Sequence, residues 1–365
     1  MRVAIDASRT TRARQTGTEA YALHLIRALI RLNDSRPNPH RLILYFRDAP
    51  SPELFPSSPH VDVRVIPIRR LWTQLGFAAA LRRDPPDVTW VPAHGLPLWF
   101  PGQAVVTVHD VGYRRFPNTH PLRQRVALEL YTRYSVARAA QVMVDSQMTG
   151  WDVARYYGTP DAKIRLVYPG VSIPRVGDIA TVRAKYRLPA RYWLYLGTLQ
   201  PRKNIQRIVA AYHLWRQAHP NDGAGLVLAG GEGWKFRADW PYDANIHMTG
   251  YVDEADKGAL YAGALGFVFP SLYEGFGFPV IEAFGVGIPV ICSNTSSLPE
   301  LAGEAALRVN PLEVGEIAAA MTQISTATDA QRAAWIQAGR AQAARFTWES
   351  AAWGALQTIE AAARR

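Results

Sequence analysis

The chain has 365 residues, 48% of them hydrophobic, and a formal net charge of +11. This length favours two domains, each with enough apolar residues for its own core. The single cysteine, Cys292, excludes a disulfide framework within the chain and suits a reducing compartment. No apolar run of about 20 residues can span a bilayer and no signal peptide precedes the first strand, so a cytoplasmic location is expected.

The positive charge is concentrated in the first half of the chain. Residues 1–180 contain 24 lysines and arginines against 14 acidic residues, whereas residues 181–365 contain 17 against 16. This asymmetry indicates an anionic partner, either nucleic acid, an anionic membrane surface or a phosphorylated substrate, although a merely solubilising basic face explains it equally well. No nucleic-acid-binding motif accompanies the charge, so no nucleic-acid partner is expected.

Short apolar runs alternate with amphipathic segments in the first half. A strand over 2–6, a polar loop over 8–18 and a helix near 19–32 open a Rossmann-like unit. The helix N-terminus at Gly17 can host an anion, although a structural turn is the simpler interpretation of a loop with one glycine. Further strands are predicted over 41–46, 61–68, 88–92, 104–108, 141–146 and 164–168, with helices over 121–139 and 147–157.

Residues 69–83 form a basic amphipathic segment that carries Trp72 and Phe77 between two arginine pairs. Such a segment can lie on an anionic membrane surface. Most amphipathic helices instead cover a sheet, so the core-covering role is favoured here.

His109 directly follows the strand over 104–108. At the carboxyl end of a strand in an α/β domain, a histidine can donate to a phosphate or a sugar hydroxyl. The alternative is a histidine held by neighbouring polar groups.

The alternation restarts after 171–190, a stretch with two prolines and a glycine that is the candidate linker. Two sets of alternating elements predict an α/β protein with two Rossmann-like, doubly wound parallel-sheet domains that face each other across a cleft. The strands of the second set are predicted over 192–196, 226–228, 246–252, 266–269, 288–292 and 305–309, with helices over 205–218, 313–325, 329–345 and 347–363.

An arginine–lysine pair follows the first strand of the second set. Gly197 ends this strand, and Arg202 and Lys203 come at the start of the next helix. Helix N-terminal amides with two cations favour a diphosphate site, whereas an isolated Arg-Lys pair is as often a surface feature. Gly230, at the next strand end, allows a ligand to approach the backbone closely.

Two carboxylates, Glu274 and Glu282, flank a Gly-Phe-Gly-Phe-Pro elbow over 275–279. Ligands bind at such strand ends in open α/β sheets, and sugar hydroxyls are donors that a buried carboxylate needs. The alternative is that Glu274 is a solvated loop residue and Glu282 a helix carboxylate satisfied by the dipole.

These motifs together resemble the retaining glycosyltransferases of family 4, which have the GT-B fold and an E-x7-E motif. The resemblance is carried by Pro201-Arg202-Lys203-Asn204, Thr249-Gly250-Tyr251 and the stretch from Pro270 through Glu282. It is specific over 192–311 and looser over 1–170, where Thr16-Gly17 stands in place of the two adjacent glycines that the family often has. It implies an N-terminal acceptor-binding domain of residues 1–172 plus 347–365 and a C-terminal nucleotide-sugar-binding domain of residues 185–346.

The resemblance also implies residue roles. Arg202 and Lys203 would hold the donor diphosphate, Glu274 the donor sugar and Glu282 the ribose, while His109 would lie near the donor sugar and phosphate. The remaining donor-binding positions implied by the family are Gly17, Gly197, Gly230, Tyr251, Phe276, Gly277 and Phe278. No metal or other cofactor is expected, because cations and helix termini replace it.

The implied reaction moves a hexose from a nucleotide sugar to a glycan or lipid-linked acceptor. The Ser297-Leu298-Pro299-Glu300 ending is similar to bacterial mannosyl- and rhamnosyltransferases of surface-polysaccharide assembly, which favours GDP-mannose as donor. One alternative is a UDP- or dTDP-sugar transferase that acts on a soluble sugar or sugar phosphate; another is a non-catalytic nucleotide-sugar-binding protein. With a lipid-linked acceptor, peripheral contact with the anionic inner face of the membrane is also expected.

Overall fold

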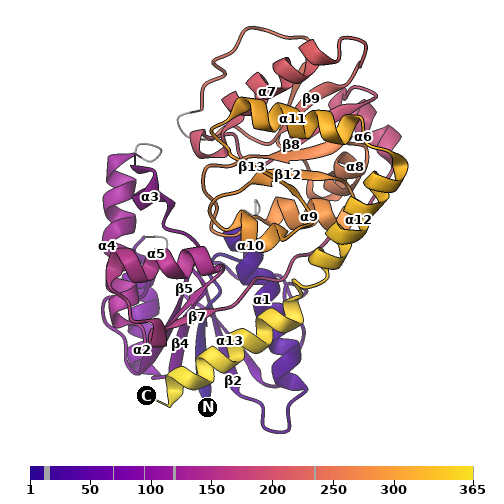
Figure 1. The fold of residues 1–365 in the computed structure, drawn as a ribbon. Coiled ribbons are helices and arrows are strands. Elements are labelled where there is room, and N and C mark those ends of the chain that lie inside the picture. Colours follow the sequence, from indigo (N-terminus) through magenta and orange to yellow (C-terminus); the bar gives the residue numbers. More distant parts are fainter. Residues whose placement is uncertain (12–16, 69, 94, 118–120, 234–235, 365) are drawn as a thin grey trace. The chain divides into compact units, whose positions relative to one another are not determined.

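The computed structural model describes residues 1–11, 17–68, 70–93, 95–117, 121–233 and 236–364. The chain divides into two compact units, each built around its own parallel sheet (Figure 1). The first unit contains Met1–Arg115, Pro121–Gly170 and Phe346–Arg365, and the second contains Val171–Arg345 with Phe116 and Pro117. Residues 12–16 of the predicted loop and Arg69 lie outside the described residues.

The sheet of the first unit has the strand order β3-β2-β1-β4-β5-β6-β7 among the described residues. β4 and β6 are buried along their whole length, as expected for parallel strands with both faces covered. At the centre of the sheet, Val3 of the first strand pairs with Leu42 of the second strand on one side and with Val88 of the fourth strand on the other. The strands are β1 (Arg2–Asp6), β2 (Arg41–Phe46), β3 (Val61–Val65), β4 (Val88–Val91), β5 (Gln103–Val108), β6 (Gln141–Val144) and β7 (Ile164–Leu166).

Helices cover the first sheet. α1 (Gly17–Asp34) and α13 (Trp348–Ala363) pack against each other, and α13 also contacts β4, β5 and β6. The remaining helices of the unit are the π-helix η1 (Trp72–Phe77), α2 (Ala78–Arg83), α3 (Gly112–Arg115), α4 (Leu122–Arg138), α5 (Gln147–Tyr157) and the short η3 (Asp161–Lys163).

The segment over 69–83 contributes to the core of the first unit. Trp72, Phe77 and Leu81 are buried in one cluster with residues of β2, β4, β5 and β6. The predicted core-covering role is therefore confirmed, and neither aromatic ring is available to a membrane.

The sheet of the second unit has the order β10-β9-β8-β11-β12-β13 among the described residues. In Figure 1, α7 (Ile205–Ala218) and α11 (Val314–Ser325) lie together on one face, and α9 (Phe278–Val286) and α12 (Asp329–Ala343) lie on the other. The strands are β8 (Tyr192–Leu196), β9 (Gly225–Ala229), β10 (Ile246–Gly250), β11 (Gly266–Phe269), β12 (Val290–Ser293) and β13 (Leu307–Val309). The short helices are η4 (Pro201–Lys203), η5 (Glu254–Asp256), α8 (Lys257–Ala262) and α10 (Leu298–Ala302).

The predicted linker over 171–190 is wrong in part, because it contains the helix α6 (Ile179–Tyr186). The Asp178 carboxylate caps this helix by accepting hydrogen bonds from the backbone N–H groups of Ala180 and Thr181. Its apolar face is small, with Val182 as the buried residue, so the periodic signal is weak.

In the described part of the chain, no helix combines the length and the apolar character that a bilayer crossing requires.

Candidate functional site

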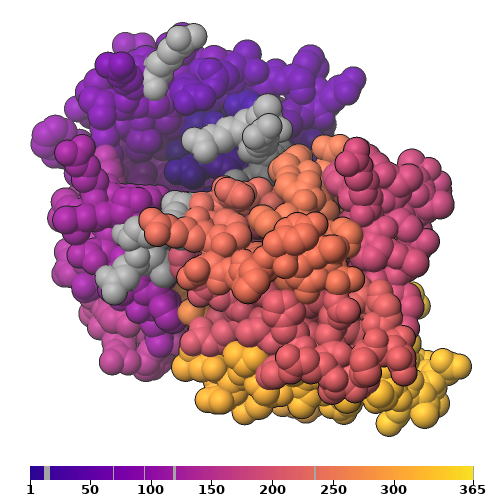
Figure 2. Space-filling view, turned by 90° about the horizontal axis from the view of Figure 1, so that it is seen from above, coloured from indigo at the N-terminus to yellow at the C-terminus, as the bar shows by residue number. Residues whose placement is uncertain are grey.

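The predicted site residues of the second unit gather at the carboxyl edge of its sheet. Gly197 follows β8, Gly230 follows β9 and Glu274 lies in the loop after β11, and β8 is paired with both β9 and β11. Parallel neighbours end at the same edge, which is where open α/β sheets bind ligands. Figure 2 shows one face of the molecule, on which residues of the second unit appear in colours from pink to orange.

Glu274, which is buried, forms an ionic cluster at this edge with Arg202 and Lys203, which are partly buried. Lys203 Nζ donates a hydrogen bond to Glu274 Oε1 over 2.6 Å, and Arg202 Nη1 lies 3.3 Å from Glu274 Oε2. Arg202 Nη1 also donates to the carbonyl oxygen of Tyr273 over 2.6 Å. Glu274 is 6% exposed, so its interpretation as a solvated loop residue is wrong. The structure brings the adjacent Arg202 and Lys203 together with Glu274, which lies 71 positions after Lys203.

Two cations contact one carboxylate in this cluster, counted over the described residues. Burial alone would raise the pKa of Glu274, but the coulombic attraction of Lys203 and Arg202 outweighs it and lowers the pKa below its usual value. Glu274 is therefore ionised, and two cations face one carboxylate. Two neighbouring cations at the strand ends are groups that can bind an anionic ligand.

Asn204 fixes the two cations relative to β11, a role that sequence reasoning missed. Its backbone is left-handed at φ 64°, which turns the chain between η4 and α7. Its side-chain Nδ2 donates to the carbonyl oxygens of Pro270 over 2.9 Å and Pro311 over 2.6 Å. Asparagine tolerates this backbone region better than most residues, so its position after the Arg-Lys pair was the available signal.

Two serines hold the Glu274 loop, and only one of them lies in a motif noted from the sequence. Ser296 Oγ accepts from the backbone N–H of Glu274 over 2.8 Å and donates to its carbonyl oxygen over 2.6 Å. Ser297 Oγ donates to the carbonyl oxygens of Glu274 and Phe276. Both contacts span more than 20 residues, so no local pattern identifies Ser296.

Gly277 makes the turn from this loop into α9. Its φ of +132° is a region that side chains rarely adopt, and a Cβ there would meet Leu298 Cδ2 at 2.7 Å. Phe276 and Phe278 flank it with ring centroids 4.9 Å apart, and Phe276 is buried. Pro279 lies in the first turn of α9, as its fixed φ favours.

Glu282 projects from α9 and is held by side chains. Its Oε2 accepts a hydrogen bond from the Tyr261 hydroxyl over 2.9 Å, and its Oε1 lies 4.0 Å from Lys257 Nζ. These partners, rather than the helix N-terminus alone, satisfy the carboxylate. Burial raises the pKa of Glu282 above its usual value, because Lys257 and Tyr261 offset the loss of solvent only in part.

Gly230 and Tyr251 lie close together at the same edge. The backbone N–H of Gly230 donates to the carbonyl oxygen of Gly250 over 2.8 Å, and Tyr251, the next residue, is half-exposed. Gly230 has a φ of +135°, and a Cβ there would lie 2.1 Å from the carbonyl oxygen of Gly197. The ends of β8 and β9 therefore touch through two glycines.

His109 belongs to the first unit and is buried. Its Nδ1 lies 2.6 Å from Asp145 Oδ2 and its Nε2 lies 2.8 Å from the carbonyl oxygen of Pro92, so both ring nitrogens face acceptors. Burial lowers the pKa of His109, but the charge of Asp145 outweighs this effect and raises the pKa above its usual value. Neighbouring polar groups thus hold this histidine, and its role toward a donor stays a prediction.

Gly17 is the first residue of α1, also in the first unit. The loop before it lies outside the described residues, and its role at a phosphate stays a prediction. Across the described ranges, no group of three or more His, Cys, Asp and Glu side chains could hold a metal ion.

Two family profiles match nearly the whole chain. Residues 179–342 match "Glycosyl transferases group 1", and residues 16–175 match "Glycosyltransferase Family 4". The first match contains the whole ionic cluster and α9. The second covers most of the first unit.

Known proteins agree with these profiles. The O-antigen chain mannosyltransferase B of Escherichia coli is 35% identical over 286 residues, 73% of each chain. The solved sucrose-phosphate synthase of Thermosynechococcus elongatus superposes with a TM-score of 0.73 at 22% identity, over 98% of this chain and 97% of that one. Anabaena HepE, solved with UDP and glucose, has a TM-score of 0.68 at 16% identity, over 98% and 99%. These likenesses confirm the predicted GT-B fold class, and the chain belongs to the family 4 glycosyltransferases.

Proposed function

We propose that the second unit binds the nucleotide-sugar donor and that the chain transfers a hexose with retention of configuration. The observation that carries this proposal is the ionic cluster of Arg202, Lys203 and Glu274. Two cations against one carboxylate suit a diphosphate, and the carboxylate suits the hydroxyl groups of the sugar attached to it. The ends of β8 and β9 pack closely through Gly197 and Gly230, which brings both strand ends to the edge of the sheet where the cluster lies.

In the proposed reaction, the bond between the anomeric carbon and the diphosphate oxygen breaks, and an acceptor oxygen bonds to that carbon from the same face. The acceptor's proton passes to an oxygen of the departing phosphate. Arg202 and Lys203 stabilise the negative charge that develops on the leaving group, which is the largest electrostatic demand of this step. We propose that the reaction needs no metal, because these two cations meet that demand.

Glu282 is proposed to bind the ribose of the donor. Its carboxylate is already fixed by Tyr261 and Lys257, so it is oriented before a ligand arrives. Tyr251 is proposed to lie near the base, and the backbone of 276–278 near sugar and phosphate. These assignments extend the family resemblance to positions at one edge of one sheet.

The proposed donor is GDP-mannose, and the proposed acceptor is a glycan or lipid-linked glycan in the cytoplasm. The name of the Escherichia coli relative, an O-antigen chain mannosyltransferase, supports mannose as the sugar and a glycan chain as the acceptor. A UDP-sugar donor is the alternative, since the HepE structure contains UDP and glucose, but HepE shares the fold at only 16% identity.

A ligand screen tests the donor site. We expect GDP and GDP-mannose to raise the unfolding temperature more than UDP, ADP or dTDP and their sugars. Glu282→Gln should weaken nucleotide binding about tenfold in calorimetry, because a charge-assisted hydrogen bond to the ribose is lost. If every nucleotide raised the unfolding temperature equally, the choice of guanine as the base would be contradicted. If none of them raised it, a protein without donor binding would be favoured.

We further propose that α4 contacts an anionic membrane surface. Leu122, Val126 and Leu130 are 64%, 48% and 62% exposed and recur every four residues, so they form one stripe on the helix. The exposed Arg123 and Arg133 lie along the same side. Aliphatic side chains that enter the headgroup region beside arginines bind anionic lipid through both effects.

Vesicle flotation tests this contact. The variant Val126→Glu/Leu130→Glu should lose at least fivefold in binding to vesicles that contain phosphatidylglycerol, while neutral phosphatidylcholine vesicles should bind neither protein. Leu214→Glu, at an exposed leucine of α7, is the matched control and should bind as the unmodified protein does. An equal loss in both variants would contradict α4 as the contact surface.

A further inference from the structure

The first unit contains a buried pair, His109 and Asp145, that the proposed reaction does not use. His109 follows β5 and Asp145 follows β6, the neighbouring strand of the sheet. Their side chains are 11% and 3% exposed, and Nδ1 of the imidazole lies 2.6 Å from Oδ2 of the carboxylate. Burial makes an unpaired charge costly, so the contacts of the two groups decide which protonation state is present.

The ring contacts of His109 require a proton on both nitrogens. Nε2 lies 2.8 Å from the carbonyl oxygen of Pro92, which only accepts hydrogen bonds, so Nε2 carries a proton. Without a second proton, the lone pair of Nδ1 would face the Asp145 carboxylate over 2.6 Å. The ordinary pKa of about 6.5 for an imidazole, against about 3.9 for an aspartate, places that second proton on Nδ1. The pair is then an imidazolium with a carboxylate.

The surroundings of Asp145 support the same state. Its Oδ1 has no hydrogen-bond partner within the described ranges, so the hydrogen bond to Oδ2 from His109 is the contact that balances its buried charge. Tyr21 lies edge-on to the imidazole, with ring centroids 4.7 Å apart at 83°, and it brings no second charge. Burial lowers the pKa of His109, but Asp145, the Pro92 carbonyl and Asp110 outweigh this effect and raise the pKa above its usual value.

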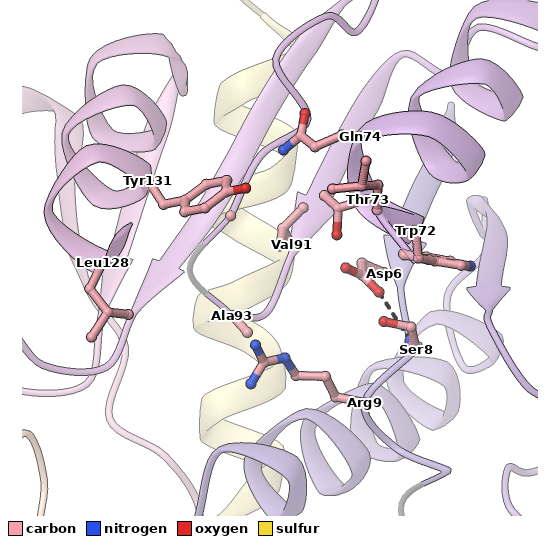
Figure 3. Close-up of a pocket in the computed structure, with 12 residues that line it drawn as sticks. Asp6, Ser8, Arg9, Trp72, Thr73, Gln74, Val91, Ala93, Leu128 and Tyr131 are labelled. Carbon is pink, nitrogen blue, oxygen red and sulfur yellow. Dashed lines mark hydrogen bonds between the residues drawn. The ribbon is translucent and has the colours of Figure 1, made fainter. Parts of the chain in front are cut away.

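Pro92 places this pair beside a cavity at the carboxyl ends of β1 and β4. Val91 and Ala93, the residues on either side of Pro92, line this cavity of about 270 Å³, as does Asp6 (Figure 3). Ligands bind at this edge of open α/β sheets. The imidazolium of His109 therefore lies next to a wall of the cavity, while the protein itself already accepts hydrogen bonds from both of its N–H groups.

We propose that Asp145 is a positioning residue that keeps His109 as an imidazolium at neutral pH, so that His109 acts in transfer by its charge and not as a base. The proposal rests on the transferase function proposed above. An imidazolium has no free lone pair and cannot take the proton of the acceptor hydroxyl. It therefore leaves that proton to the departing phosphate, as in the proposed reaction.

NMR of protein labelled with ¹⁵N-histidine tests the protonation state directly. The signals of His109 are those that disappear in His109→Gln, and both ring nitrogens should be protonated at about pH 7, above the ordinary pKa of about 6.5. Asp145→Asn keeps the shape of the side chain and should lower the ratio of protonated to neutral His109 at least tenfold. Asp48→Asn is the matched control, since it removes a carboxylate of the same unit that is 58% exposed, and should leave the ratio unchanged. A neutral His109 in the unmodified protein would overturn the proposal, and so would an unchanged ratio in Asp145→Asn.

Thermal unfolding gives a second measurement that needs no assignment of signals. A histidine whose pKa is raised in the folded state stabilises the fold at pH values below its unfolded-state pKa, and this stabilisation disappears as the pH rises through the folded-state pKa. The unmodified protein should therefore lose more stability than Asp145→Asn between about pH 6 and about pH 9. Equal losses in the two proteins would contradict the ion pair.

The pH dependence of kcat separates this inference from the transferase function. If His109 acts as a cation, kcat should fall on the alkaline side, and the fall should begin at a lower pH in Asp145→Asn. A fall on the acid side that Asp145→Asn displaces would make His109 a base and would overturn the inference. If the unmodified protein transfers no hexose, the transferase function fails, whereas the NMR measurement still decides the state of His109.

Discussion

Replacement of Lys203 by alanine should lower kcat by about a hundred- to a thousandfold, the usual cost of one donor that stabilises transition-state charge. The ammonium group lies 2.6 Å from Glu274 and beside Arg202 at the strand edge. We expect the KM for the donor to change less than kcat, because leaving-group charge develops mainly in the transition state. Steady-state kinetics with a radiolabelled nucleotide sugar measures both.

The same change leaves Glu274 buried with Arg202 as its remaining cation at 3.3 Å. The folded state should lose about 1–3 kcal/mol, since a buried charged group loses a hydrogen bond. The pKa of Glu274 should rise, because burial persists while part of the attraction is removed. A carboxylate whose pKa is lower in the folded state than in the unfolded state stabilises the fold at pH values above its unfolded-state pKa. This stabilisation disappears as the pH falls through the folded-state pKa. The stability that the variant loses at Glu274 should therefore be visible at neutral pH.

A double variant separates the two effects. Lys203→Ala/Glu274→Gln removes both charges, so it should regain stability in thermal unfolding but no transfer activity. Lys185→Ala is the control, since Lys185 also pairs with two carboxylates but is 47% exposed, where such pairs contribute little. A kcat within tenfold of normal in folded Lys203→Ala would contradict the diphosphate role.

Replacement of Gly230 by alanine should destabilise the second unit by about 3 kcal/mol or more, from overpacking and from backbone strain together. A Cβ would stand 2.1 Å from the carbonyl oxygen of Gly197, at a φ of +135°. The blocking atom belongs to the backbone after β8, so it cannot move without displacing the strand end that leads to Arg202. The unfolding midpoint should fall by roughly 6–12 °C.

Gly231 is the matched control for this change. A Cβ there meets no heavy atom within 4 Å in the described structure, and its φ is not in the positive range. Gly231→Ala should therefore shift stability by less than about 0.5 kcal/mol. Donor binding should be impaired in the first variant and retained in the second. Similar unfolding midpoints for both variants would show that the contact between Gly197 and Gly230 is not tight in solution.

Local pattern was sufficient for most elements of the second unit. The helix predicted over 205–218 is observed at Ile205–Ala218, and the apolar strand over 266–269 is observed at Gly266–Phe269. Continuous apolar runs that end in glycine or proline are signals contained within a few residues. Local pattern failed at α6, where eight residues between a glycine and a proline carry little apolar periodicity and depend on the Asp178 cap.

The sequence by itself determined the two sets of alternating elements, the position of the Arg-Lys pair after a strand and the two carboxylates around a glycine elbow. It did not decide between a solvated and a buried Glu274, because the partners of that carboxylate lie 71 residues away. The cavity around Asp6 was equally out of reach, since four separate segments line it. Backbone conformation follows from neighbouring residues, whereas burial and charge pairing are set by segments that meet only in the folded chain, so only the tertiary structure decided them.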